Sequence, residues 1–66
     1  MEMMLVDDFN RYEVARWCNG MIARDGMPGL IVSDSINGKI RAMPGDIIVK
    51  FNYGFMVFAP KENIGI

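Results

Sequence analysis

Four basic side chains and one tyrosine are the residues of this sequence best suited to binding chemistry. Lys39 and Arg41 point to the same side of a predicted strand, because side chains alternate along a strand. Lys50 follows on the next predicted strand, across a Pro-Gly turn, and strand order decides whether Arg24 joins them. Arginine forks onto phosphate or carboxylate oxygens, and Tyr53, in a tight turn, can stack on a base. These five residues predict a small anion-binding patch, with a solvated sheet face as the simpler alternative.

Catalytic and metal-binding chemistry has little support in the composition. The chain has no histidine, which removes the commonest general base and the commonest metal ligand. The single cysteine, Cys18, lies on an apolar helix face, which favours a buried structural thiol. Asp7 and Asp8 lie at a predicted helix start, where carboxylates are stabilising, and metal or acid–base work is the less favoured alternative. We therefore predict a non-enzymatic protein with no catalytic residue, no bound metal and no cofactor.

Length and composition predict one small domain, residues 1–66, that associates with other chains. Of the 66 residues, 52 % are apolar, and a domain this small leaves part of such material exposed. Exposed apolar patches usually mark association surfaces, so we expect a homo-oligomer or an obligate partner. The net charge of −1 argues against general nucleic-acid binding. The lone cysteine and the lack of a long apolar run favour a cytoplasmic protein that does not engage a membrane.

One helix is predicted over residues 10–19. Asn10 is a suitable N-cap, and Glu13 follows three residues later, as a capping box requires. Phe9 and Val14 occupy the two positions of a hydrophobic staple. The Asn-Gly pair that follows is a good helix stop.

The remaining chain alternates short strand patterns with turn signals. Asn37-Gly38 is the preferred pair for a tight type I′ hairpin turn, and Pro44-Gly45 fits the centre of a type II turn. Strands are predicted at 2–6, 21–24, 30–34, 39–42, 46–51 and 55–59, followed by a tail over 60–66 that either packs or frays. The predicted fold class is α+β: a short N-terminal strand, one helix, and a four- to five-stranded antiparallel meander or small open barrel.

An ordered set of motifs resembles a family of small phage and prophage proteins. The matching residues are Trp17-Cys18-Asn19-Gly20, then Asn37-Gly38, then Arg41-Ala42-Met43-Pro44-Gly45-Asp46-Ile47-Ile48-Val49-Lys50, and finally Gly54-Phe55. The family pattern is a helix ending in Trp/Phe-Cys/Leu-Gly-Gly, a hairpin, and Arg-Ala-x-Pro-Gly-Asp-Trp-Ile-Ile-Lys-Gly-x-x-Gly-Glu-Phe. Ile47 replaces the family's tryptophan, and the acidic residue between Gly54 and Phe55 is missing, so no role of either residue is carried over.

The resemblance implies a phage protein that acts in the cytoplasm of the host cell, and it leaves the function open. The first hypothesis is a counter-defence protein that sequesters a nucleotide second messenger as an oligomer, with the predicted basic patch holding its phosphates. The alternative is a protein–protein inhibitor or adaptor of a host defence enzyme, with Phe51, Met56, Phe58 and the methionines as its contact surface. A structural accessory part without a ligand is the third hypothesis.

Overall fold

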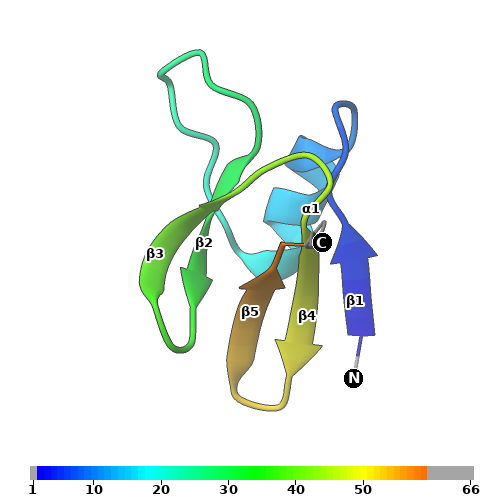
Figure 1. Cartoon of the computed structure of the whole chain (residues 1–66), viewed down its shortest axis with the longest axis vertical. Coiled ribbons are helices and arrows are strands. Elements are labelled where there is room, and N and C mark those ends of the chain that lie inside the picture. The colour runs from blue at the N-terminus through cyan, green and yellow to red at the C-terminus, as the bar shows by residue number, and fades with distance from the viewer. Residues whose placement is uncertain (1, 60–66) are drawn as a thin grey trace, which may run out of the picture.

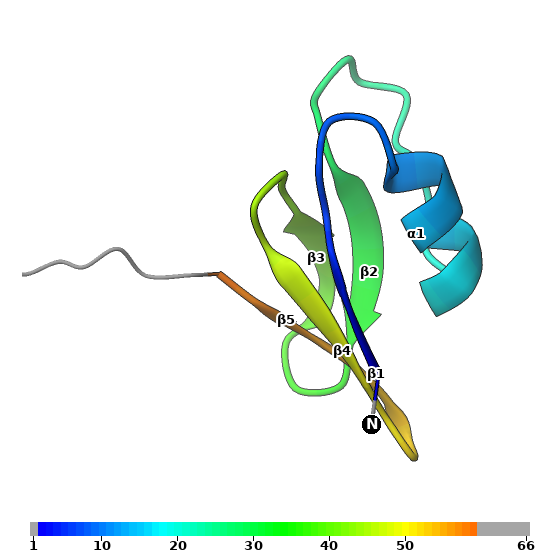
Figure 2. The same cartoon turned by 90° about the vertical axis from the view of Figure 1, so that its right-hand side faces the viewer.

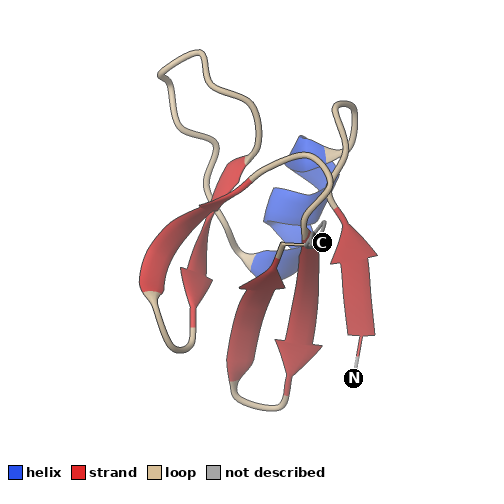
Figure 3. Cartoon of the chain, in the orientation of Figure 1, coloured by secondary structure: helices blue, strands red, loops and turns tan. Residues whose placement is uncertain are grey.

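A computed structural model describes residues 2–59 of the chain, and it confirms the predicted α+β class (Figure 1). The predicted tail over 60–66 lies outside the described residues. Within them the order of elements is β1 (Glu2–Leu5), α1 (Arg11–Cys18), β2 (Leu30–Asp34), β3 (Gly38–Ala42), β4 (Ile47–Phe51) and β5 (Gly54–Phe58). The strands and the long connections between them are distinguished by colour in Figure 3.

The five strands form one open sheet in the order β1-β4-β5-β2-β3. The β2–β3 and β4–β5 hairpins are antiparallel, as predicted, but β2 and β5 are parallel neighbours, so the sheet is mixed and is not a simple meander. The cause is the connection between β3 and β4. The Gly45 N–H donates to the Val6 carbonyl and the Val6 N–H donates to the Asp46 carbonyl, which directs β4 alongside β1 and away from β3.

Helix α1 packs against one face of this sheet, and Figure 2 shows it on that side alone. Three of its residues, Val14, Ala15 and Cys18, are buried. They join side chains from the strands in a single core, in which the fully buried members from the strands and the segment after β1 are Val6, Leu30, Val32, Ala42 and Ile48. The face of the sheet that α1 covers is called the inner face, and the opposite face is called the outer face.

The predicted capping box and hydrophobic staple at the start of α1 are both wrong. Asn10 makes no side-chain cap bond to the helix, and its Oδ1 instead accepts the Asp7 N–H at 2.9 Å. The Asp7 Oδ1 accepts the N–H groups of Phe9 and Asn10 at 2.7 and 2.9 Å. This local turn competes with capping geometry, as aspartate side chains commonly do. It also leaves Phe9 95 % exposed, far from the buried Val14.

The predicted strand over 21–24 is reduced to one isolated bridge between Met21 and Ile31. Gly20 lets the chain approach β2 closely, because a Cβ there would lie 2.7 Å from the Ile31 carbonyl oxygen. Beyond Met21 the chain leaves β2 and forms a loop over 22–29, which side chains of α1 and β3 hold against the end of the sheet.

Of the two turns predicted in detail, one is confirmed and one is wrong. The Asp46 N–H donates to the Met43 carbonyl at 2.9 Å and Gly45 has a φ of 101°, as a turn with Pro-Gly at its centre requires. The β2–β3 hairpin is not a two-residue type I′ turn. Asp34 pairs with Gly38, three residues lie between them, and only Gly38 has positive φ. The Asp34 side chain, which binds the turn's N–H groups, accounts for the longer loop.

Candidate functional site

The predicted basic patch is divided between two faces and two distant strands. Lys39 and Arg41 lie on β3, and Lys50 lies on β4, with β2 and β5 between these strands. Three strand spacings correspond to about 14 Å. Arg41 alternates with the buried core residue Ala42, which places Arg41 on the outer face. Lys50 shares the inner face with Ile48, so this part of the prediction, that Lys50 lies near Lys39 and Arg41, is wrong.

Arg41 braces the 22–29 loop. Its Nη2 pairs with the Asp25 carboxylate, and its Nη1 donates to the Pro28 carbonyl at 3.1 Å. The Met27 N–H, with a further contribution from the Arg41 charge, holds the pKa of Asp25 below its usual value. Arg24 is exposed in the same loop, next to Asp25. The charge of Arg41 is therefore already matched within the chain.

The two remaining predicted positions, Tyr53 and Lys39, lie on separate hairpins of the sheet, β4–β5 and β2–β3. Tyr53 is 82 % exposed in the β4–β5 turn, and its ring stacks on Phe51 with centroids 6.0 Å apart. Lys50, at the same end, lines a shallow depression of about 180 Å³. Lys39 lines another of about 230 Å³, with Asn19, Gly20, Met21, Ile31 and Ser33. Both are below the ~300 Å³ of a typical small-ligand pocket. Ligand binding by these residues stays a prediction.

A third depression, of about 270 Å³, lies beside the 22–29 loop and is lined by Asp7, Asp8, Arg11, Gly26, Met27, Pro28, Gly29 and Pro44. The guanidinium of Arg11 in this depression is already bound within the chain, because its Nη1 donates to the Met27 carbonyl at 3.0 Å and to the Gly29 carbonyl at 3.4 Å. Arg11 thus fixes the loop from the helix, as Arg41 does from β3.

Neither the thiol nor the acidic residues of the described chain form a reactive cluster. Cys18 is 4 % exposed in the core, and burial raises the pKa of its thiol, which keeps it protonated. Between residues 2 and 59, no three histidine, cysteine or acidic side chains gather closely enough to hold a metal ion. The helix found in that range is also too short and too polar to cross a membrane.

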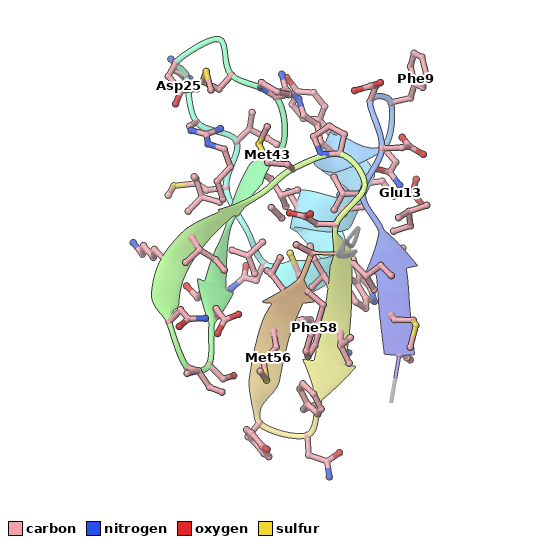
Figure 4. The ribbon with its side chains drawn as sticks, viewed as in Figure 1. Phe9, Glu13, Asp25, Met43, Met56 and Phe58 are labelled. Carbon is pink, nitrogen blue, oxygen red and sulfur yellow. The ribbon has the colours of Figure 1, made fainter. Side chains whose placement is uncertain are left out.

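The outer face of β1, β4 and β5 is apolar, and no helix of the described residues lies over it. The strand register aligns its side chains in two rows across the three strands. One row is Met3, Val49 and Met56, and the other is Leu5, Ile47 and Phe58. Figure 4 shows Met56 and Phe58 on β5, well separated from Phe9 at the far end of the molecule. We call these six side chains the outer patch.

The outer patch is most exposed on β1 and β5, the two strands that flank β4. Met3 is 62 % exposed, Leu5 56 % and Phe58 46 %, whereas Val49 in the middle is 7 % exposed because its neighbours surround it. The patch contains no charged side chain, and Phe51 extends it toward Tyr53. The sequence carries a signal for this surface: β4 and β5 are apolar at consecutive positions, a pattern typical of strands covered on both faces.

The outer patch is the feature of the described residues with the clearest functional implication. Contiguous exposed apolar surface on a small protein generally marks a site of association. It includes Met56 and Phe58, two of the three contact residues named in the protein–protein hypothesis, and Phe51 adjoins it. Comparisons with protein-family models, with curated proteins and with solved structures found no match to this chain.

Proposed function

We propose that this chain is a non-enzymatic phage accessory protein that acts by binding another protein through the outer patch. The observation that supports the proposal is the pair of uncharged rows on β1, β4 and β5, which no helix within residues 2–59 covers. Covering these side chains removes apolar surface from water, which is the main driving force of protein association. The two methionines, Met3 and Met56, can adapt to a partner's shape. The phage resemblance suggests a host defence enzyme as the partner.

Sequestration of a nucleotide second messenger is the weaker candidate on this geometry. A phosphate-binding site needs several cations that converge on one ligand. In a single chain Arg41 is paired with Asp25, and Lys50 lies on the opposite face of the sheet. A nucleotide site built from these residues would therefore need contributions from more than one chain.

The proposal predicts that two lysines in the outer patch abolish capture of a host protein. Leu5→Lys and Phe58→Lys place charge at exposed positions, and Leu5 lies on the edge strand β1, where lysine is well tolerated. Losing about half of a buried leucine or phenylalanine contact should weaken binding about tenfold for each substitution. The measurement is affinity capture from bacterial host lysate, with bound proteins identified by mass spectrometry.

A matched control comes from two exposed apolar residues elsewhere. Phe9 and Ile36 are 95 % and 72 % exposed and lie outside the outer patch, so Phe9→Lys with Ile36→Lys adds the same charge. The control should retain the partner that the wild type captures. Retention of that partner by the Leu5/Phe58 variant would contradict the proposal. A nucleotide bound to the purified wild type, with no captured protein, would favour sequestration instead.

A further inference from the structure

We infer that the outer patch also binds the outer patch of a second copy, so that two sheets pack face to face in a two-fold symmetric homodimer. The inference rests on the surface used in the proposed function, but it commits to a different occupant. Three observations support it: the state of the sheet edges, the absence of charge in the patch, and the amount of apolar surface.

The sheet edges are poorly suited to pairing with another copy, which leaves the face. On β1, the Leu5 carbonyl is already the acceptor of an internal hydrogen bond from Asn10 Nδ2 at 2.9 Å. On β3, the other edge strand, Lys39 supplies a charge of the kind that commonly blocks edge-to-edge association. Association through an added strand is therefore disfavoured at both edges.

The patch can meet its own copy without burying an unpaired charge. In a two-fold contact the same surface faces itself, so any charged side chain near the axis would meet a like charge. The two rows contain only aliphatic, methionine and phenylalanine side chains. Val49, in the middle strand of the three and already 7 % exposed, is the natural position for the axis. In such a contact the two sheets would lie about 10 Å apart with their strands within about 30° of parallel.

The apolar area is sufficient for a weak dimer. A large side chain of this kind presents roughly 200 Å², so the exposed parts of the outer patch, with the adjoining Phe51 and Tyr53, come to roughly 500 Å². Two copies would then bury about 1,000 Å², the lower limit for specific interfaces. We expect a dimer that forms at micromolar concentration and dissociates on dilution. A tighter partner could then displace the second copy.

The mass in solution tests the inference. Sedimentation velocity of the wild type over a range of concentrations should show a monomer–dimer equilibrium. The Leu5→Lys, Phe58→Lys variant should be monomeric throughout, with a dimer dissociation constant raised at least about a hundredfold, because each substitution occurs twice in the contact. The Phe9→Lys, Ile36→Lys control should match the wild type.

A second measurement needs no substitution. In a mixture of isotope-labelled and unlabelled wild type, intermolecular NOEs should connect the methyl groups of Ile47, Val49 and Met56 across the two copies. A wild type that is monomeric at every concentration, or a dimer whose intermolecular NOEs lie elsewhere, would overturn the inference. A monomer that still captures its host partner would leave the proposed function standing. A patch-dependent dimer without any partner would overturn the proposed function alone.

Discussion

Replacing Asp34 with alanine should lower the free energy of unfolding by about 3 kcal/mol, as measured by urea denaturation. A chain of this length is expected to have a total stability of roughly 3–10 kcal/mol, so this single change removes a large part of it. The effect is large because Asp34 joins the β2–β3 hairpin to β5, and so to the rest of the sheet.

Within residues 2–59, the β2–β3 hairpin and the three strands β1, β4 and β5 form the two halves of the sheet, and the ladder between them has one residue pair, Asp34 with Phe55. Asp34 is 5 % exposed, and its Oδ1 accepts the N–H groups of Ile36 and Asn37 at 2.8 and 3.0 Å. Its Oδ2 accepts the Val57 N–H of β5 at 2.9 Å, a bond that crosses between the halves. Alanine would leave these three donors without their acceptor, and unsatisfied donors away from water are costly.

Asp46 provides a matched control for this substitution. It is also a turn carboxylate, but its side chain accepts one backbone bond, from the Met43 N–H at 2.8 Å, within its own turn. Asp46→Ala should therefore cost about 1 kcal/mol. Equal losses for Asp34→Ala and Asp46→Ala would contradict the role of Asp34 as the junction of the sheet.

The Asp34 carboxylate should also make the free energy of unfolding depend on pH in the acid range. The N–H groups of Asn37, and then of Val57, hold the pKa of Asp34 below its usual value. A carboxylate with a lowered folded-state pKa stabilises fully above its unfolded pKa, about 4, and loses that stabilisation as pH falls through the folded-state value. Asp34→Asn should lack this part of the decline in the free energy of unfolding as the pH falls below about 4. Identical pH profiles for the variant and the wild type would contradict this assignment.

Local signals in the sequence predict the local structure well, and they fail where distant contacts decide. The Pro44-Gly45 turn forms as expected, because proline and glycine fix its backbone angles without help from the rest of the chain. The distance between Arg41 and Lys50 depended instead on strand order. No residue near the turn indicates that Val6 would form hydrogen bonds with the backbone of the turn, at the Gly45 N–H and the Asp46 carbonyl, and so place β4 beside β1.

The candidate site was predictable in composition but not in position. A 52 % apolar chain of 66 residues must expose apolar surface somewhere, and the contact residues Phe51, Met56 and Phe58 do lie on the outer face. Their alignment with Met3 and Leu5 follows from the pairing of β1 with β4, which joins residues more than forty positions apart. Phe9 and Ile36, equally apolar, lie outside the patch because local turns hold them away from the sheet.

Gly29→Ala should destabilise the fold by more than about 3 kcal/mol, enough to leave much of the chain unfolded at room temperature. Gly29 is buried where the 22–29 loop meets the end of β3, with a φ of 84°. A Cβ there would lie 2.1 Å from the Ala42 carbonyl oxygen, which is backbone and cannot rotate away. Relief would require the loop to separate from β3, which would break the Arg11 and Arg41 bonds to its carbonyls.

Gly26→Ala is the control that separates the clash with the Ala42 carbonyl from the strain of a positive φ. Gly26 lies in the same loop with a nearly equal φ of 77°, but a Cβ added there would have no atom within 4 Å. It should therefore show only the cost of a left-handed alanine, about 1–2 kcal/mol. Thermal unfolding of both variants, followed by circular dichroism, measures the difference. Similar melting temperatures for the two would mean that the loop is not seated on β3, because only a seated loop makes the Ala42 carbonyl an obstacle to Gly29 and not to Gly26.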